Sequence, residues 1–255
     1  MAAFDASESL TPFEYGRHGH ASGQGAILFD AAVSPQVGHE WFAPDYWREH
    51  DALRMQAGGR GGVAIIATPA GDCVLRHYRR GGLVAALMGD RYLWTGAGRT
   101  RAFAEFRLLA DIARLQLPGP AVVAARYCRR GLFYSADLIT RRIADAQTLA
   151  ECLAAGRLDG ELAEEVGALV ARFHRAGIWH ADLNAHNVLV AAGQLYLIDF
   201  DRGRLRTPAN AWQQANLQRL RRSLLKLGAA SQGEAAFEEA IWQPLLYRYG
   251  RTLTP

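Results

Sequence analysis

Two short segments of the chain hold polar residues whose types and spacing suit phosphoryl transfer. The first is His-Ala-Asp-Leu-Asn-Ala-His-Asn at residues 180–187, and the second is Leu-Ile-Asp-Phe-Asp at residues 197–201. The terminal phosphate of a nucleotide carries negative charge on its oxygens, so its transfer requires magnesium, which prefers hard oxygen ligands. Asn187 and Asp199 can supply such oxygens. Asp182 can accept a hydrogen bond from the attacking hydroxyl and act as its base.

Two short strands are expected to bring these residues together. Residues 194–198 have the composition of a short buried strand that delivers Asp199, and residues 187–190 look like the strand opposite it. A hairpin of these strands would place Asn187 beside Asp199. The resulting order of acid, amide and acid is typical of the catalytic loop of a kinase.

Two other interpretations of these residues stay open. A His-x-Asp turn and an acid-rich strand end also occur as ordinary loop features, with His180 a hydrogen-bonded loop histidine. Alternatively, His180, Asp182 and His186 would be zinc ligands. The zinc site leaves Asn187 and Asp199 without a role.

A glycine-rich segment in the first half of the chain is a candidate nucleotide-binding loop. It comprises residues 57–62 and includes Gly59, Arg60 and Gly61. Glycines let backbone amides approach phosphates closely, so we expect this loop to cover a nucleotide, although such a turn is often only a flexible connection. Strands at residues 63–67 and 73–78 should follow as an antiparallel pair.

A cation for the nucleotide phosphates must come from arginine, because the only lysine of the chain is Lys226. Arg76 falls in the second of these strands and is the expected phosphate contact. A helix over residues 100–116 carries Glu105, which we expect to pair with Arg76 and orient it. The alternatives are a solvent-facing strand arginine and a solvated helix glutamate.

The remaining pattern predicts further strands and helices. Strands are expected at residues 26–29, 121–125 and 132–139, and helices from an Asp159 cap to Gly177, over 210–227 and over 235–248. An aromatic group around Pro44, formed by Trp41, Phe42, Tyr46 and Trp47, should pack on its own domain rather than touch a membrane interface. The basic residues of 210–227 should form the solvated face of a helix whose leucines are in the core.

Composition fits an enzyme with a sizeable core. The chain has 255 residues, half of them apolar, a net charge of +4 and three scattered cysteines that we expect to be free thiols. No segment reaches the length of a membrane span, and residues 1–10 lack the apolar stretch of a secretory signal, so we expect a cytoplasmic protein. The basic balance suits anionic partners without choosing between nucleotide, lipid phosphate and nucleic acid.

At the level of motifs, the chain resembles the 3-deoxy-D-manno-octulosonic acid (Kdo) kinases of the lipopolysaccharide kinase family. The resemblance is carried by residues 75–82, by Asp90-Arg-Tyr92, by residues 180–187 and by residues 197–204. It implies an α+β, protein-kinase-like bilobal fold. Residues 1–137 would form an N-lobe with a small antiparallel sheet and one long helix, and residues 138–255 a mainly helical C-lobe.

The resemblance also implies an activity. The expected reaction is ATP-dependent phosphorylation of the 4-hydroxyl of Kdo on Kdo-lipid A, in lipopolysaccharide core biosynthesis. Asp182 would be the catalytic acid/base, Asn187 and Asp199 the Mg²⁺ ligands, and Arg76 and Glu105 the ion pair of the N-lobe. The protein would contact the cytoplasmic face of the bacterial inner membrane peripherally, with no nucleic acid and no obligate protein partner. Asp201 stands where kinases usually have glycine.

Two alternatives to a Kdo kinase remain at this point. Another small-molecule phosphotransferase, of the heptose or aminoglycoside kinase type, would share the catalytic loop. A non-catalytic, kinase-shaped binding module would have no physical need for Asp182, Asn187 and Asp199 together.

Overall fold

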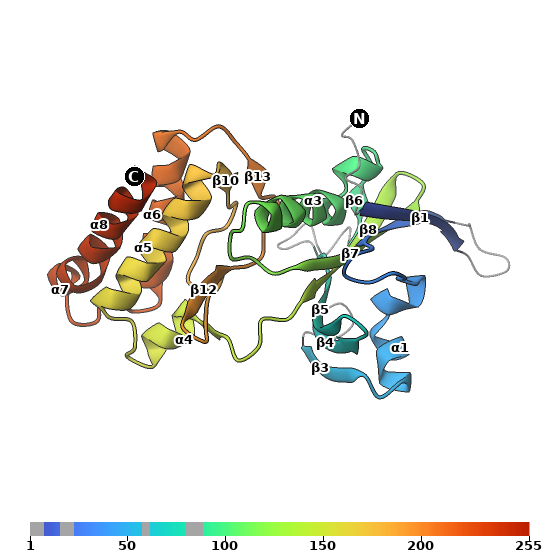
Figure 1. Cartoon of the computed structure of the whole chain (residues 1–255), viewed down its shortest axis with the longest axis horizontal. Helices are drawn as coiled ribbons and strands as arrows, with labels where there is room; N and C mark the ends of the chain where they lie inside the picture. The colour runs from blue at the N-terminus through green and yellow to red at the C-terminus, as the bar shows by residue number, and fades with distance from the viewer. Residues whose placement is uncertain (1–7, 16–22, 58–61, 80–88, 255) are drawn as a thin grey trace. The chain divides into compact units, whose positions relative to one another are not determined.

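The computed structural model describes residues 8–15, 23–57, 62–79 and 89–254. The chain divides into two compact units, Met1–Ala110 with Ala121–Arg142 and Asp111–Pro120 with Ile143–Pro255. We call the first the sheet unit and the second the helical unit, and each is described by itself (Figure 1).

The sheet unit is built on one antiparallel sheet, which within the described residues has eight strands. Seven of them follow the spatial order β1 (Glu8–Tyr15), β2 (Gly23–Asp30), β7 (Val122–Arg130), β8 (Phe133–Arg141), β5 (Gly71–His77), β4 (Val63–Thr68) and β3 (Leu53–Ala57), and β6 (Tyr92–Leu93) pairs with β8. The expected pair β4 and β5 is confirmed, with Val63 opposite Arg76 in the register. Strand β1 was not predicted.

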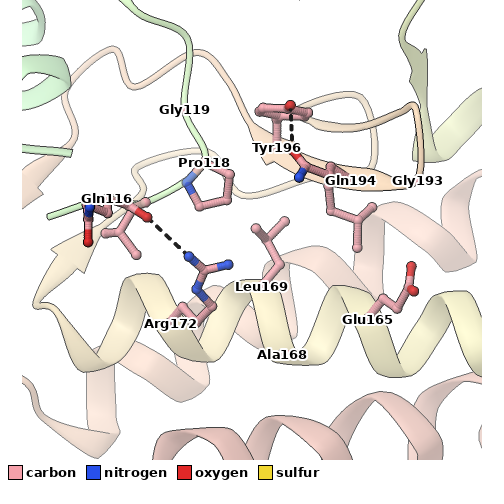
Figure 2. A pocket seen from close by; sticks show the side chains of 12 residues that line it. Gln116, Pro118, Gly119, Glu165, Ala168, Leu169, Arg172, Gly193, Gln194 and Tyr196 are labelled. Atoms are coloured by element: carbon pink, nitrogen blue, oxygen red, sulfur yellow. Dashed lines mark hydrogen bonds between the residues drawn. The ribbon is translucent and has the colours of Figure 1, made fainter. Parts of the chain in front are cut away.

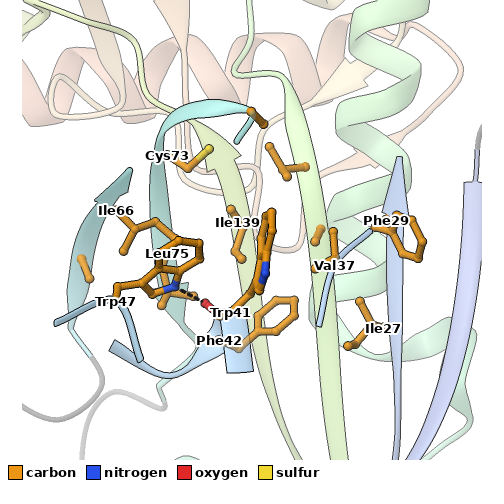
Figure 3. Packing of buried hydrophobic residues seen from close by; sticks show 14 residues of the cluster. Ile27, Phe29, Val37, Trp41, Phe42, Trp47, Ile66, Cys73, Leu75 and Ile139 are labelled. Atoms are coloured by element: carbon orange, nitrogen blue, oxygen red, sulfur yellow. Dashed lines mark hydrogen bonds between the residues drawn. The ribbon is translucent and has the colours of Figure 1, made fainter. Parts of the chain in front are cut away.

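The aromatic group around Pro44 packs into the core of the sheet unit, as predicted. A 3-10 turn, η1 (His39–Phe42), and a short helix, α1 (Pro44–Glu49), carry these residues. Trp41, Phe42 and Trp47 are buried against residues of the central strands, including Ile66 and Ile139 (Figure 3). The indole Nε1 of Trp47 donates a hydrogen bond to the backbone carbonyl of Trp41, so its polar atom is satisfied inside the core.

Helix α3 (Arg101–Arg114) follows the short 3-10 turn η2 (Ala97–Arg99) and confirms the expected helix. Its buried residues include Phe103, Phe106, Leu109 and Ile112, while Ala113 is exposed. Glu105 lies on the buried side of the helix as well.

The helical unit is built mainly from helices. Those of the described residues are α4 (Leu149–Ala154), α5 (Gly160–Arg175), α6 (Asn210–Lys226), α7 (Glu234–Phe237), the π-helical turn η3 (Glu238–Trp242) and α8 (Gln243–Leu253), of which α5, α6 and α8 are the longest. Asp159 caps α5, as predicted, by accepting a hydrogen bond of 2.9 Å from the backbone N–H of Leu162. Helices α5 and α8 run side by side (Figure 1), and Gly167 permits this contact because a β-carbon there would collide with the backbone of Leu245.

The predicted helix over residues 235–248 is present, with a π-helical turn in its middle. The chain forms α7, the π-helical turn η3 and α8 in succession. Pro244 accounts for the π-helical turn, because it has no N–H to donate to the carbonyl of Ala240 and its ring would clash with that carbonyl in a regular α-helix. A π-helical turn just before the proline widens the backbone at this point.

Short strands complete the helical unit and frame the segment that carries the predicted chemistry. Strand β11 (Val188–Ala191) pairs with β12 (Gln194–Leu197) and with β9 (Gln147–Thr148), while β10 (Ile178–Trp179) pairs with β13 (Arg204–Leu205).

The predicted α+β class, with an antiparallel sheet, one long helix and a mainly helical remainder, is confirmed. Among the described residues, no helix has both the length and the hydropathy to cross a membrane.

Candidate active site

The buried side chain of His180 holds the loop between β10 and β11 through two hydrogen-bonding contacts. This side chain is 2% exposed, and its Nε2 lies 2.9 Å from the backbone carbonyl oxygen of Ile198. Its Nδ1 accepts a hydrogen bond of 3.1 Å from the backbone N–H of Asp182. Burial lowers the pKa of His180 below its ordinary value of 6.5, so the ring is neutral and serves both contacts. His180 therefore positions the loop.

Asp182 has an oriented and accessible carboxylate. Its Oδ1 lies 3.0 Å from Nη1 of Arg219 on α6, and its Oδ2 accepts a hydrogen bond of 3.1 Å from Nδ2 of Asn184. A carboxylate has several lone pairs, so these contacts leave acceptor capacity for a substrate hydroxyl. These contacts leave the role of Asp182 as a general base a prediction that the geometry allows.

Asn187 connects the loop to the hairpin. The side chain is 8% exposed, and its Nδ2 donates a hydrogen bond of 3.0 Å to the backbone carbonyl of Asp182. Because Nδ2 is used as a donor here, Oδ1 is the atom of this amide that can serve as a metal ligand.

The predicted hairpin is present as β11 and β12. Val188 faces Leu197 in the register, and the backbone N–H of Ile198 donates a hydrogen bond of 3.0 Å to the carbonyl of Asn187. Asp199 comes directly after this closing bond and has a φ of 61°, in the left-handed region that residues other than glycine seldom adopt. The hairpin therefore brings the backbones of residues 187 and 199 together.

Aromatic packing supports the segment around Asp199. Phe200 is fully buried and stacks on Phe173 of α5, with ring centroids 5.7 Å apart. The same ring lies 4.9 Å from the imidazole of His180. One buried side chain thus packs against both the loop of residues 180–187 and the end of β12.

The donor set suits magnesium better than zinc. Within the described residues, no group of three or more His, Cys, Asp or Glu side chains could hold a metal ion, so the zinc site of His180, Asp182 and His186 has no support. Asn187 and Asp199 offer an amide oxygen and a carboxylate, which are the hard oxygen donors that Mg²⁺ takes while keeping several waters.

The expected pairing of Arg76 with Glu105 is present in the sheet unit. Nη2 of Arg76 lies 2.5 Å from Oε1 of Glu105, which is 3% exposed, so Glu105 is not a solvated helix glutamate. The hydroxyl of Tyr78 donates to the other carboxylate oxygen. Burial, together with the Glu105 charge, raises the pKa of Tyr78 well above its ordinary value, and the phenol stays a donor. Arg76 is therefore oriented by a buried acid.

The glycine-rich loop cannot be placed in this way, since Gly59, Arg60 and Gly61 lie outside the described residues. Its role in nucleotide binding stays a prediction.

Two groups of contacts were missed by sequence reasoning. His77 lies 2.6 Å from a carboxylate oxygen of Asp137 and 2.7 Å from one of Asp90, and Arg126 contacts Asp137 at 2.7 Å. Burial alone would lower the pKa of His77, but the carboxylates outweigh it and raise that pKa above 6.5. The contact between Arg219 and Asp182 was also missed, because only the packing of α6 brings them together.

A cavity of about 650 Å³ lies elsewhere in the helical unit (Figure 2). It is lined by residues of α5, β12 and the segment before Pro120, and Arg172 donates a hydrogen bond of 3.1 Å to the carbonyl of Gln116 at its edge. Asp182, Asn187 and Asp199 are absent from its lining, so this cavity is not part of the predicted site.

A loop supported by a buried histidine carries the acid Asp182, and the hairpin that follows has the amide Asn187 at one end and the acid Asp199 at the other. This order is the arrangement of a kinase-type phosphotransferase. The chain belongs to the lipopolysaccharide kinase (Kdo/WaaP) family, which it matches over residues 44–249. This family confirms the expectation of an ATP-dependent phosphotransferase.

Individual relatives are similar over most of their length. The 3-deoxy-D-manno-octulosonic acid kinase of Xanthomonas axonopodis pv. citri (strain 306) is 51% identical over 229 residues, covering 89% of each chain. The kinase of the same name from Stenotrophomonas maltophilia (strain R551-3) is 50% identical over 241 residues, covering 94% of this chain and 92% of its own. Among solved structures, WaaP in complex with acyl carrier protein aligns with 19% identity and a TM-score of 0.49, covering 86% of this chain and 81% of that one.

Proposed function

We propose that this chain transfers the terminal phosphate of ATP to the 4-hydroxyl of Kdo on Kdo-lipid A, in lipopolysaccharide core biosynthesis. Membership of the Kdo/WaaP family supports this reaction, as do relatives named Kdo kinase that share about half of their residues with this chain. The observation that carries the proposal is the connected set of Asp182, Asn187 and the hairpin that ends at Asp199.

The residues divide the work of an in-line displacement. Asp182 accepts the proton of the acceptor hydroxyl, whose oxygen forms a bond to the terminal phosphorus while the bond to the bridging oxygen of ADP breaks. Asn187 and Asp199 would hold Mg²⁺. When bound, magnesium neutralises negative charge on the nucleotide phosphates.

Nucleotide binding falls to the sheet unit in this proposal. Arg76, oriented by Glu105, contacts the phosphates, and the loop containing Gly59, Arg60 and Gly61 covers them. We further propose that the sheet unit and the helical unit are the N-lobe and the C-lobe of a kinase. Because its substrate is a lipid, the enzyme would act as a peripheral protein at the cytoplasmic face of the inner membrane.

Incubation of the purified protein with magnesium, ATP and Kdo-lipid A tests this function. The expected product is Kdo-lipid A with a mass gain of one phosphate, and fragmentation should place the phosphate on Kdo. Parallel reactions contain a heptose-bearing core without Kdo, or an aminoglycoside, as the acceptor. Transfer to either of these in preference to Kdo-lipid A would contradict the proposal.

A further inference from the structure

Arg219 lies beside the proposed catalytic base, and we propose that its guanidinium binds the carboxylate of the Kdo acceptor. The inference rests on the proposed function, since it takes Asp182 as the group that receives the acceptor hydroxyl. It assigns the recognition of an acidic sugar to a named residue of α6.

The geometry of the pair leaves it open to a substrate. Nη1 of Arg219 lies 3.0 Å from Oδ1 of Asp182, and the two side chains are 46% and 61% exposed. Exposed ion pairs of this kind contribute little to folding stability. The pair is therefore not needed to hold α6 in place, and a solute can reach both partners.

Arg219 keeps donors for a second anion. A guanidinium presents several N–H groups in a planar fork that matches a carboxylate, and the contact with Asp182 is made through Nη1 alone. The neighbouring Arg221 is engaged differently, because it pairs with Glu234 at 2.9 Å and also with Glu238. Arg219, by contrast, contacts the proposed base.

The distances fit the acceptor. A hydroxyl that is hydrogen-bonded to Oδ1 of Asp182 lies two consecutive hydrogen-bond lengths from Nη1 of Arg219, which is at most about 6 Å. In Kdo, only the ring carbons C2 and C3 separate the carboxylate carbon from the carbon that bears the 4-hydroxyl. A hydroxyl at Asp182 therefore brings the sugar carboxylate within reach of Arg219.

The negative charges of the site explain why a cation such as the Arg219 guanidinium is needed for an acidic acceptor. Asp182 and Asp199 both repel an anionic sugar, so a site for an acidic acceptor needs a compensating positive group on the acceptor side. A neutral or cationic acceptor would have no such need. Arg219 would in this way favour Kdo over heptose or an aminoglycoside.

Steady-state kinetics with two acceptors test the inference. Kdo-lipid A and its Kdo methyl ester are compared in wild type, Arg219→Gln and Arg219→Lys, with Arg248→Gln on α8 as the matched control. For Arg219→Gln we expect the KM for Kdo-lipid A to rise about 10- to 100-fold, since a charge-assisted contact is lost. The KM for ATP should change less than about 2-fold, as expected for loss of one separate contact.

The methyl ester separates recognition of the carboxylate from a role in positioning Asp182. The ester should raise the acceptor KM of wild type and Arg248→Gln but add nothing in Arg219→Gln, while Arg219→Lys keeps part of the discrimination. A lower kcat with unchanged acceptor KM, a raised KM for ATP, or an equal ester effect in all variants would overturn the inference. A wild-type enzyme that leaves Kdo-lipid A unphosphorylated would overturn the proposed function, and the inference with it.

Discussion

Asn187 donates a hydrogen bond of 3.0 Å from its side-chain amide to the backbone carbonyl of Asp182. The contact fixes the proposed metal ligand and the proposed base on one loop. It also defines the orientation of the amide, with Oδ1 left as the ligand atom. Placement of the base and binding of the metal are therefore coupled through a single side chain.

Replacing Asn187 by alanine should remove both functions at once. We expect kcat to fall at least about 100-fold and the magnesium concentration for half-maximal activity to rise. Loss of one buried hydrogen bond should lower the free energy of unfolding by only about 1 kcal/mol. Magnesium titrations of activity check this, with Asn210→Ala at the exposed start of α6 as the control. An Asn187→Ala enzyme with normal magnesium dependence would exclude the ligand role.

Asp199 should separate activity from stability. Its φ of 61° suits glycine better than aspartate. The free energy of unfolding of Asp199→Gly should therefore lie within about 1 kcal/mol of the wild-type value, while turnover is lost. Ala192, in the turn of the same hairpin, has a φ of 46° and gives a matched control, since Ala192→Gly relaxes similar strain. Ala192→Gly should keep wild-type activity. Thermal unfolding and kinetic assays of both variants make the comparison, and an active Asp199→Gly enzyme would contradict the metal role.

Several elements were predictable because their signals are local. The hairpin of β11 and β12, the pair of β4 and β5, and the Asp159 cap all follow from patterns within about twenty residues. Strand β1 was missed, since it depends on pairing with β2 rather than on its own composition.

Within the site, the order of Asp182, Asn187 and Asp199 is visible in the sequence, but their supports are not. Arg219 lies on a helix whose rotation is set by burial of Leu217, Leu220 and Leu224, and the sequence does not say what its basic face meets. Asp137 is a buried acid in the middle of β8. Its partners are His77 of β5 and Arg126 of β7, the strands on either side of β8. Only the register of the sheet shows that these residues lie opposite Asp137.

The pair of Arg76 and the buried Glu105 should matter for both folding and nucleotide binding. Glu105→Ala leaves the guanidinium of Arg76, which is 23% exposed, without this carboxylate, so the free energy of unfolding should fall by about 2 kcal/mol. Glu105→Gln keeps the shape and should cost less. If Arg76 binds the nucleotide, both variants should raise the KM for ATP more than the KM for the acceptor. Urea unfolding and kinetics measure the two effects, and an unchanged KM for ATP would remove Arg76 from the nucleotide site.

Buried histidines in the helical unit predict sensitivity to acid. Burial is the main cause that lowers the pKa of His174 from 6.5 to about 4, and its ring contacts Tyr249 and Asn216. The unfolded chain binds a proton below pH 6.5 that the folded chain does not bind until about pH 4. The contribution of His174 to the free energy of unfolding is therefore fully present above about pH 6.5 and is lost as the pH falls toward about 4.

Unfolding in urea at two pH values measures this effect. Between about pH 7 and pH 5, His174 should account for a loss of about 2 kcal/mol. His174→Gln should be less stable at neutral pH but should show a smaller loss on acidification, whereas the exposed-site control His50→Gln should behave as wild type. An unchanged loss in His174→Gln would show that other groups cause the acid sensitivity.

The central claim is that Asp182, Asn187 and Asp199 work as one centre for phosphoryl transfer. Single-turnover transfer from ATP to Kdo-lipid A, measured for Asp182→Asn, Asp199→Gly and the double variant, tests it most directly. Residues that act as a unit have strongly non-additive effects. The double variant should therefore be about as slow as the slower single variant. Rate losses that multiply, or a single variant that retains wild-type transfer, would contradict a shared centre.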